Sequence, residues 1–149
     1  MKTLLPRWLP VLLLACAQGA SAAELPAIHL EIKNHKIVAE VAATDAARAK
    51  GLMHRFSLAP DHGMVFVFPA PQGIGMWMRN TYIPLSVAFI DAEGRILSIA
   101  DMQPKDETVH SSAGLALYAL EMRQGWFRER GLGPGETVKG LAKAGSAKN

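Results

Sequence analysis

The sequence predicts a mainly β (α+β) fold, a small antiparallel sheet or barrel-like domain with one or two short helices. Short runs of alternating apolar and polar residues, separated by glycine and proline clusters, indicate the strands. Only a few short segments show helix signals. The chain has 149 residues, enough for one such domain with a hydrophobic core and too few for two ordinary ones.

The start of this domain predicts a β-hairpin followed by a helix. Residues 27–33 and 36–42 alternate apolar and polar side chains, the pattern of half-buried strands. Thr44 then suits a helix N-cap, and Gly51 stands where a helix would end. We therefore expect one short helix between these two residues.

The rest of the domain predicts a meander of further strands. Residues 64–68 are continuously apolar, which is typical of a strand buried on both faces. We expect residues 103–114 to form a long loop and residues 126–130 one helical turn. Further strands are expected at residues 76–80, 85–90, 95–101, 115–122 and 136–141.

The N-terminal residues 1–22 have the parts of a signal peptide: Lys2 and Arg7, an apolar stretch, and small residues ending at Ala22. The apolar stretch is too short for a membrane-spanning helix, and no transmembrane segment is expected elsewhere. Cleavage after Ala22 leaves a single domain over residues 23–141 and a flexible tail over residues 142–149. This pattern predicts a soluble periplasmic or secreted protein.

An alternative cut lies earlier in the same segment. Leu13-Leu14-Ala15-Cys16 resembles a lipoprotein processing box, which would make Cys16 the lipid-bearing first residue of an anchored protein. Ala20-Ser21-Ala22 fits a soluble-export site better, and we favour that interpretation.

The composition argues against several function classes. Without residues 1–22 the chain has 14 basic and 13 acidic residues, a net charge of +1, so nucleic-acid binding has little support. Cys16 is the one cysteine, and cleavage after Ala22 removes disulfides, thiol catalysis and thiolate metal ligands. The sequence points to no cofactor and does not indicate an oligomeric state.

Four motifs, in order over residues 30–140, resemble the domain of unknown function 192 family. They are Gly51-Leu52-Met53-His54-Arg55; Gly63-Met64-Val65-Phe66-Val67-Phe68; Trp77-Met78-Arg79-Asn80-Thr81 with Ile83-Pro84-Leu85; and Leu120-Glu121 with Gly125. The resemblance implies a compact domain, frequent behind an export signal or lipoprotein anchor in bacteria, with no established activity. The chain departs from the family pattern at Ser86, usually Asp, and at His54 and Met76, usually aromatic.

Polar residues inside these apolar motifs predict a ligand-binding site. A guanidinium group supplies five fixed donors, and Asn and Thr add orienting polar atoms, so a small polar or anionic ligand is the expected partner. The structural alternative is that Arg55 or Arg79 pairs with Glu121 to tie strands together. The candidate residues are Arg55, Arg79, Asn80, Thr81 and Glu121.

Three other functions remain open alongside this non-enzymatic binding or accessory domain. Thioether and imidazole groups suit a copper(I) carrier in a compartment where cysteine is unavailable; they occur in Met53-His54, at His62 with Met64, and at Met76 with Met78. An envelope hydrolase would need a serine site, or a carboxylate pair chosen from Asp61, Asp101, Asp106 and Glu107, but no catalytic motif supports it. A purely structural or protein-contact module is the third. His29, His35 and His110 lack zinc-ligand spacing.

Overall fold

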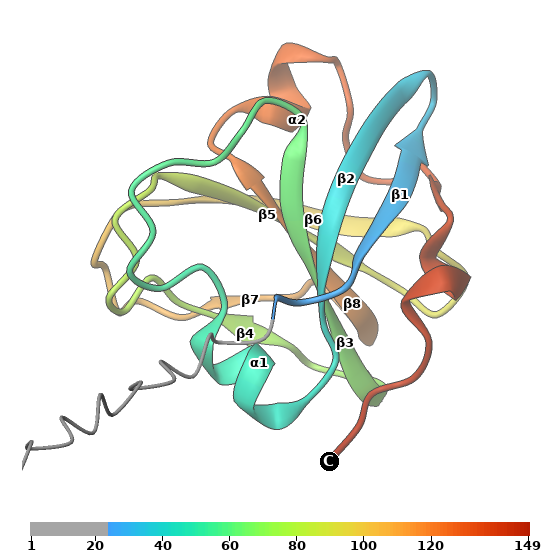
Figure 1. The fold of residues 1–149 in the computed structure, drawn as a ribbon. Helices are drawn as coiled ribbons and strands as arrows, with labels where there is room; N and C mark the ends of the chain where they lie inside the picture. Colours follow the sequence, from blue (N-terminus) through green and yellow to red (C-terminus); the bar gives the residue numbers. More distant parts are fainter. Residues whose placement is uncertain (1–23) are drawn as a thin grey trace, which may run out of the picture.

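The computed structural model describes residues 24–149, so the predicted signal peptide and Cys16 lie outside the described residues. The described chain forms a curled seven-stranded sheet with a small two-stranded sheet beside it (Figure 1). This confirms the predicted mainly β fold with short helices. The strands are β1 (Ala27–Ile32), β2 (His35–Ala42), β3 (His62–Gln72), β4 (Gly75–Met76), β5 (Leu85–Ile90), β6 (Ile96–Met102), β7 (His110–Ser111), β8 (Ala116–Arg123) and β9 (Val138–Lys139). The helices are α1 (Asp45–Lys50), α2 (Trp126–Glu129) and the 3-10 helix η1 (Leu141–Ala144).

The strand order of the large sheet is β6-β5-β8-β3-β2-β1-β9. The predicted hairpin of β1 and β2 is confirmed. Of the predicted meander, β5 and β6 are antiparallel neighbours, but β3 and β5 are not, because β8 lies between them and pairs antiparallel with both. A central position completes the backbone hydrogen bonds of an almost fully buried strand on both sides. β2 and β3 are parallel, since α1 returns the chain to the end of the sheet where β2 began.

The predicted strand over residues 76–80 is also wrong in extent. Its strand pairing is limited to β4, which pairs with β7 inside the predicted long loop. The expected alternation of burial nevertheless holds there: Met76 and Met78 are buried, whereas Trp77 is exposed.

The caps predicted for α1 are both present. Thr44 Oγ1 accepts the backbone N–H three residues further on, at 3.1 Å, and Gly51 ends the helix with a φ of +48°. A helix this short is marginal alone. Arg48 Nη1 fixes it to the sheet by donating to the carbonyl oxygens of Ala43 and Val67, at 2.7 and 2.9 Å.

Both faces of the sheet are covered, and β8 shows the division. Leu120 and Met122 pack into one apolar cluster, with α2 and η1 around it. Ala119 belongs to the second cluster, which lies beside α1 and the segment around β4. Because side chains alternate along a strand, Glu121 faces the same side as Ala119.

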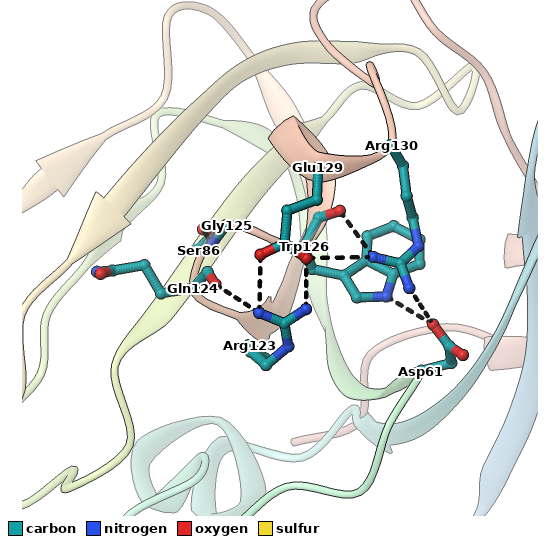
Figure 2. A network of polar contacts seen from close by, with 8 residues as sticks. All are labelled: Asp61, Ser86, Arg123, Gln124, Gly125, Trp126, Glu129 and Arg130. Carbon is teal, nitrogen blue, oxygen red and sulfur yellow. Dashed lines mark hydrogen bonds and ion pairs between the residues drawn. The ribbon is translucent and has the colours of Figure 1, made fainter.

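α2 lies at the opposite end of the molecule from α1 (Figure 1). A polar network attaches it to the residues just before β3 (Figure 2). Trp126 Nε1 and Arg130 Nη2 both donate to Asp61 Oδ1, at 2.8 and 2.9 Å. The Arg130 guanidinium lies 4.3 Å from the Trp126 ring centroid. Arg123 makes a two-pronged contact with Glu129, as Figure 2 shows.

The C-terminal strand is shorter than predicted. β9 is followed by η1, where Leu141 is buried. The backbone N–H of Lys148 donates to the carbonyl oxygen of Ala43 at 2.7 Å, so the last residues run past the start of α1. The predicted flexibility of residues 142–149 concerns motion and stays a prediction.

Candidate ligand-binding site

A cavity of about 310 Å³ lies between α1, β3 and the segment around β4. This volume is at the small end of the range for ligand sites. The main sheet contributes Glu121 from β8, and α1 contributes Arg48 and Lys50. The remaining lining residues are Ala49, Gly51, Leu52, Met53, Phe66, Phe68, Gly75, Met76, Trp77 and Thr81.

Glu121 is the unusual residue of this cavity. It is 3 % exposed, and its strand neighbours are Met64 on β3 and Val87 on β5, both fully buried. Among residues 24–149, no side-chain or backbone group forms a hydrogen bond with its carboxyl. Buried polar groups in proteins are usually hydrogen-bonded, so an unpartnered carboxyl beside a cavity needs an explanation.

Burial determines the protonation state of this carboxyl. Desolvation raises the pKa of Glu121 from 4.5 to about 8, and no neighbouring charge opposes the effect. At neutral pH the group is therefore mainly a neutral acid that can donate a hydrogen bond. Arg48 and Lys50 are the charged groups that α1 brings to the cavity, and β3, β4 and β5 bring none.

The walls of the cavity are mainly apolar and narrow. A Cβ atom at Gly51 would lie 3.2 Å from the Phe66 ring, and one at Gly75 would lie 2.7 Å from a Val109 methyl group. Thr81 adds a hydroxyl group, which donates to the carbonyl oxygen of Arg79 at 3.1 Å. The site therefore combines aromatic and thioether surfaces with very few polar atoms.

Of the five predicted site residues, Thr81 and Glu121 line this cavity, whereas Arg55, Arg79 and Asn80 lie elsewhere. Arg55 lines a second cavity of about 800 Å³ between α1 and the residues before β1. There its two terminal nitrogens donate to the two carboxylate oxygens of Glu40, at 2.6 and 2.7 Å. This hydrogen bonding lowers the pKa of Glu40.

Arg79 and Asn80 line a third, shallow depression together with Tyr82, Lys105 and Glu107. The guanidinium of Arg79 is 3.5 Å from Glu107 and lies over the Trp77 ring, 5.6 Å from its centroid. The structural alternative, in which Arg55 or Arg79 pairs with Glu121, is wrong, because each arginine has another partner.

The methionine and histidine residues proposed for copper(I) lie in different places. Met64 and Met78 are fully buried in the second apolar cluster, away from solvent. The His62 ring contacts the Pro60 carbonyl oxygen at 2.8 Å, and His54 lies against Tyr82 on the surface. Only Met53 and Met76 of this set line the Glu121 cavity.

Ser86 and Asp101 contact each other and have further partners in the fold. The Ser86 hydroxyl donates to Asp101 and accepts the N–H of Gly125 at 2.9 Å. The Ser86 hydroxyl and then Arg128 lower the pKa of Asp101. An aspartate at position 86 would place a second carboxylate beside Asp101, so the serine avoids repulsion there.

The four acids considered as a catalytic pair have separate partners. Asp61 accepts from Trp126, Asp101 from Ser86, and Asp106 from a backbone N–H, while Glu107 is paired with Arg79. The described residues therefore show no pairing among these four carboxylates.

Sequence reasoning missed the apolar walls of the cavity. The sequence pattern predicts only that Phe66 and Phe68 belong to a buried strand. Their spacing of two residues places them on the same face as Met64, whose partner across the sheet is Glu121. The signal was present in the alternation along β3. The packing of α1 decides which face of β3 borders a cavity, and the strand pattern alone does not contain that information.

The family model of DUF192, described as "Uncharacterized ACR", matches residues 28–140, and the chain belongs to this family. A crystal structure of a proposed transcription regulator from Sinorhizobium meliloti is similar, with 31 % identity and a TM-score of 0.79, covering 81 % of this chain and 98 % of that one. A protein of unknown function from Novosphingobium aromaticivorans is similar at 36 % identity and a TM-score of 0.73, covering 78 % of this chain and 86 % of that one. No curated protein matches the chain.

The described part of the chain contains no helix that is long and apolar enough to cross a membrane. The family description assigns no activity, so a functional argument has to start from the cavity itself.

Proposed function

We propose that this chain is an exported, non-enzymatic binding domain that holds a small, mostly apolar molecule in the Glu121 cavity. The observation that supports this most strongly is the position of Glu121. Its carboxyl is buried, has no partner among the described residues and borders a cavity with aromatic walls. A ligand with a polar group at this position would supply the missing hydrogen bond.

An unpartnered buried carboxyl lowers the free energy of unfolding of the protein. Leaving such a group without a hydrogen bond costs about 1–3 kcal/mol, and a charged group costs more. Leucine or methionine would fill the same position in the apolar cluster without this cost. Strongly perturbed carboxyls of this kind cluster at functional sites, which supports a role in binding.

A thermal-shift screen of residues 23–149 against small metabolites tests the proposal. We expect at least one compound to raise the midpoint of the wild-type protein, because a ligand at about 100 times its Kd stabilises the folded state by about 2.7 kcal/mol. Glu121→Leu, which keeps the position apolar, should abolish that shift.

Arg79→Ala is the matched control, since Arg79 lies outside the cavity. It should retain most of the shift. The proposal is wrong if no compound raises the wild-type midpoint, or if a compound raises the midpoints of wild type and Glu121→Leu equally.

Export is supported by the pattern of residues 1–22, and the product of processing tests it. The full chain is produced in a bacterial host and the intact mass of the protein is measured after fractionation. A periplasmic species beginning at Ala23 is expected. A lipid-modified species beginning at Cys16 would indicate an anchored protein, and a cytoplasmic species that retains Met1 would contradict export.

A second candidate function is copper(I) binding in the same cavity. Met53 and Met76 both line it, and Met76 is paired across the small sheet with His110. The Nε2 atom of His110 is buried and has no hydrogen-bond partner among the described residues. Thioether and imidazole groups are suitable ligands for copper(I).

Native mass spectrometry with copper(I) separates this candidate from organic-ligand binding. A one-to-one adduct should form with wild type and disappear in Met76→Leu. Met102→Leu is the control, because Met102 is buried without lining the cavity. An adduct that survives Met76→Leu, or none with wild type, would rule out this copper site.

A further inference from the structure

The charges around the Glu121 cavity are arranged with opposite signs on opposite sides. Glu121 contributes an acidic group from β8, in the middle of the sheet, whereas Arg48 and Lys50 contribute basic groups from α1. The other lining residues are uncharged. A ligand that spans the cavity therefore meets a carboxyl at one end and cations at the other.

The sheet side of the cavity suits an ammonium group. A carboxylate is the natural counter-ion, and the faces of aromatic rings attract cations. Phe66 lines this cavity on the strand face of Met64 and Glu121, whereas the Phe68 and Trp77 rings already face Arg48 and Arg79. An ammonium group placed here would pair with a carboxylate that the protein itself leaves without a partner.

The α1 side suits an anionic group. Arg48 donates to the carbonyl oxygens of Ala43 and Val67 and is paired with the Asp45 carboxylate, so its guanidinium already has its own partners. Lys50 is exposed at the last position of α1 and forms no ion pair within residues 24–149. Lys50 is therefore the cation that favours a carboxylate or a similar anion at this side of the cavity.

We propose that the ligand is a small zwitterion, with its ammonium group toward Glu121, its anionic group toward Lys50, and an apolar body between the aromatic walls. The inference rests on the proposed binding function and specifies its ligand class. The cavity volume of about 310 Å³ limits the ligand to roughly the size of an amino acid with a large side chain.

Binding of such a ligand is linked to a proton. The free cavity keeps Glu121 protonated at neutral pH, and pairing with an ammonium group requires the carboxylate. One proton therefore leaves Glu121 for the buffer as the ligand binds. Arg48 and Lys50 are the other charged groups that line the cavity.

Four probes with one phenyl body test the ligand class by calorimetry: phenylalanine, 2-phenylethylamine, 3-phenylpropionate and 3-phenylpropanol. Phenylalanine should bind most tightly. Its affinity should rise about tenfold per pH unit between pH 6 and pH 7, because only the ionised carboxyl binds. Comparison of buffers with different heats of ionisation should show release of nearly one proton per ligand at pH 7.

Two variants assign the two ends of the ligand. Glu121→Gln should weaken the binding of phenylalanine and remove the pH dependence of its affinity. Lys50→Gln should weaken the binding of phenylalanine and leave the binding of 2-phenylethylamine nearly unchanged. Because Lys50 is exposed, the substitution should leave the fold intact.

These outcomes separate a failure of the zwitterion inference from a failure of the proposed binding function. If 3-phenylpropionate or 3-phenylpropanol binds as tightly as phenylalanine, or if no proton is released, the zwitterion inference is wrong and the cavity is still a binding site. If no probe binds while the thermal-shift screen finds another compound, the inference is also wrong. If neither experiment finds a ligand, the binding function fails as well.

Discussion

Two carboxyls near α1 show how local surroundings set the chemistry of a residue. Glu40 is half-buried, and hydrogen bonds from Arg55 lower its pKa. Glu121 is fully buried without a partner, and desolvation raises its pKa to about 8. The first carboxyl stays ionised in a salt bridge, whereas the second is a neutral acid that changes charge near physiological pH. Only Glu121 is therefore suited to a proton-linked binding step.

This difference predicts how stability depends on pH. In the unfolded chain Glu121 ionises near 4.5, whereas in the folded protein it ionises near 8. The folded state therefore binds one more proton between these values, and stability is lost as pH rises through this window, by about 1.4 kcal/mol per pH unit. Glu121→Gln should remove this contribution.

Urea unfolding of wild type and Glu121→Gln at pH 5, 6, 7 and 8 measures it. The free energy of unfolding of the variant, relative to wild type, should increase steadily across this series. A difference that stays constant with pH would show that Glu121 titrates at its ordinary value.

Ser86 gives a second prediction at this scale. Ser86→Ala removes the acceptor of the buried Gly125 N–H and the donor to Asp101. We expect a loss of about 1–3 kcal/mol in the free energy of unfolding. Ser57→Ala, at an exposed position, should change it by less than about 0.5 kcal/mol. Equal values for the two variants in chemical denaturation would contradict a structural role for Ser86.

Among the elements, α2 depends on one carboxylate for its attachment to the start of β3. Asp61 accepts from both Trp126 and Arg130, and it has a φ of +55° (Figure 2). Asparagine tolerates this backbone conformation and keeps an acceptor oxygen, whereas alanine does neither. The strength of the attachment should therefore differ between these two substitutions.

Asp61→Ala should destabilise the protein by roughly 1–3 kcal/mol, because it leaves the indole N–H without its acceptor. Asp61→Asn should lose clearly less. Both values come from urea titrations followed by tryptophan fluorescence. If the two variants are equally stable, the indole hydrogen bond does not contribute to attaching α2.

The pairing of β3 with β8 depends on Gly63. A Cβ atom there would lie 2.3 Å from the Glu121 carbonyl oxygen and 2.4 Å from the Met122 sulfur. Gly63→Ala must push the two strands apart, and we expect a loss of roughly 1–3 kcal/mol or more. Gly73→Ala is the control, since nothing lies within 4 Å of its Cβ position. Wild-type melting temperatures for both variants would refute this close approach.

The elements that the sequence predicted correctly are those with local signals. Alternation identified β1 and β2, and the positions of Thr44 and Gly51 identified α1. The insertion of β8 between β5 and β3 and the pairing of β4 with β7 join distant segments, and no local pattern specifies such partners.

The candidate site was predicted in part for the same reason. Glu121 and Thr81 stand out as polar residues within apolar runs, and both line the cavity. Arg55 and Arg79 stood out equally, but their partners, Glu40 and Glu107, are chosen by tertiary packing. A sequence identifies charges in unusual surroundings, and the fold decides which of them meet.

At the scale of the whole molecule, the curled sheet has α1 near one end and α2 near the other (Figure 1). The face of α2 and η1 is closed by large apolar side chains and the Asp61 network. The opposite face leaves a cavity beside α1, a six-residue helix. Glu121 stands in the central strand, where its neighbours hold it on both sides. The cavity thus lies between the sheet, which contributes Glu121, and α1, which contributes Arg48 and Lys50.

Carbon-13 NMR of the Glu121 side-chain carboxyl, assigned with Glu121→Gln and followed through a pH titration, tests the central claim most directly. An unpartnered carboxyl at the cavity should titrate near 8 in the free protein, and it should become ionised at pH 7 when phenylalanine is added. A midpoint near 4.5, unchanged by the ligand, would contradict the account.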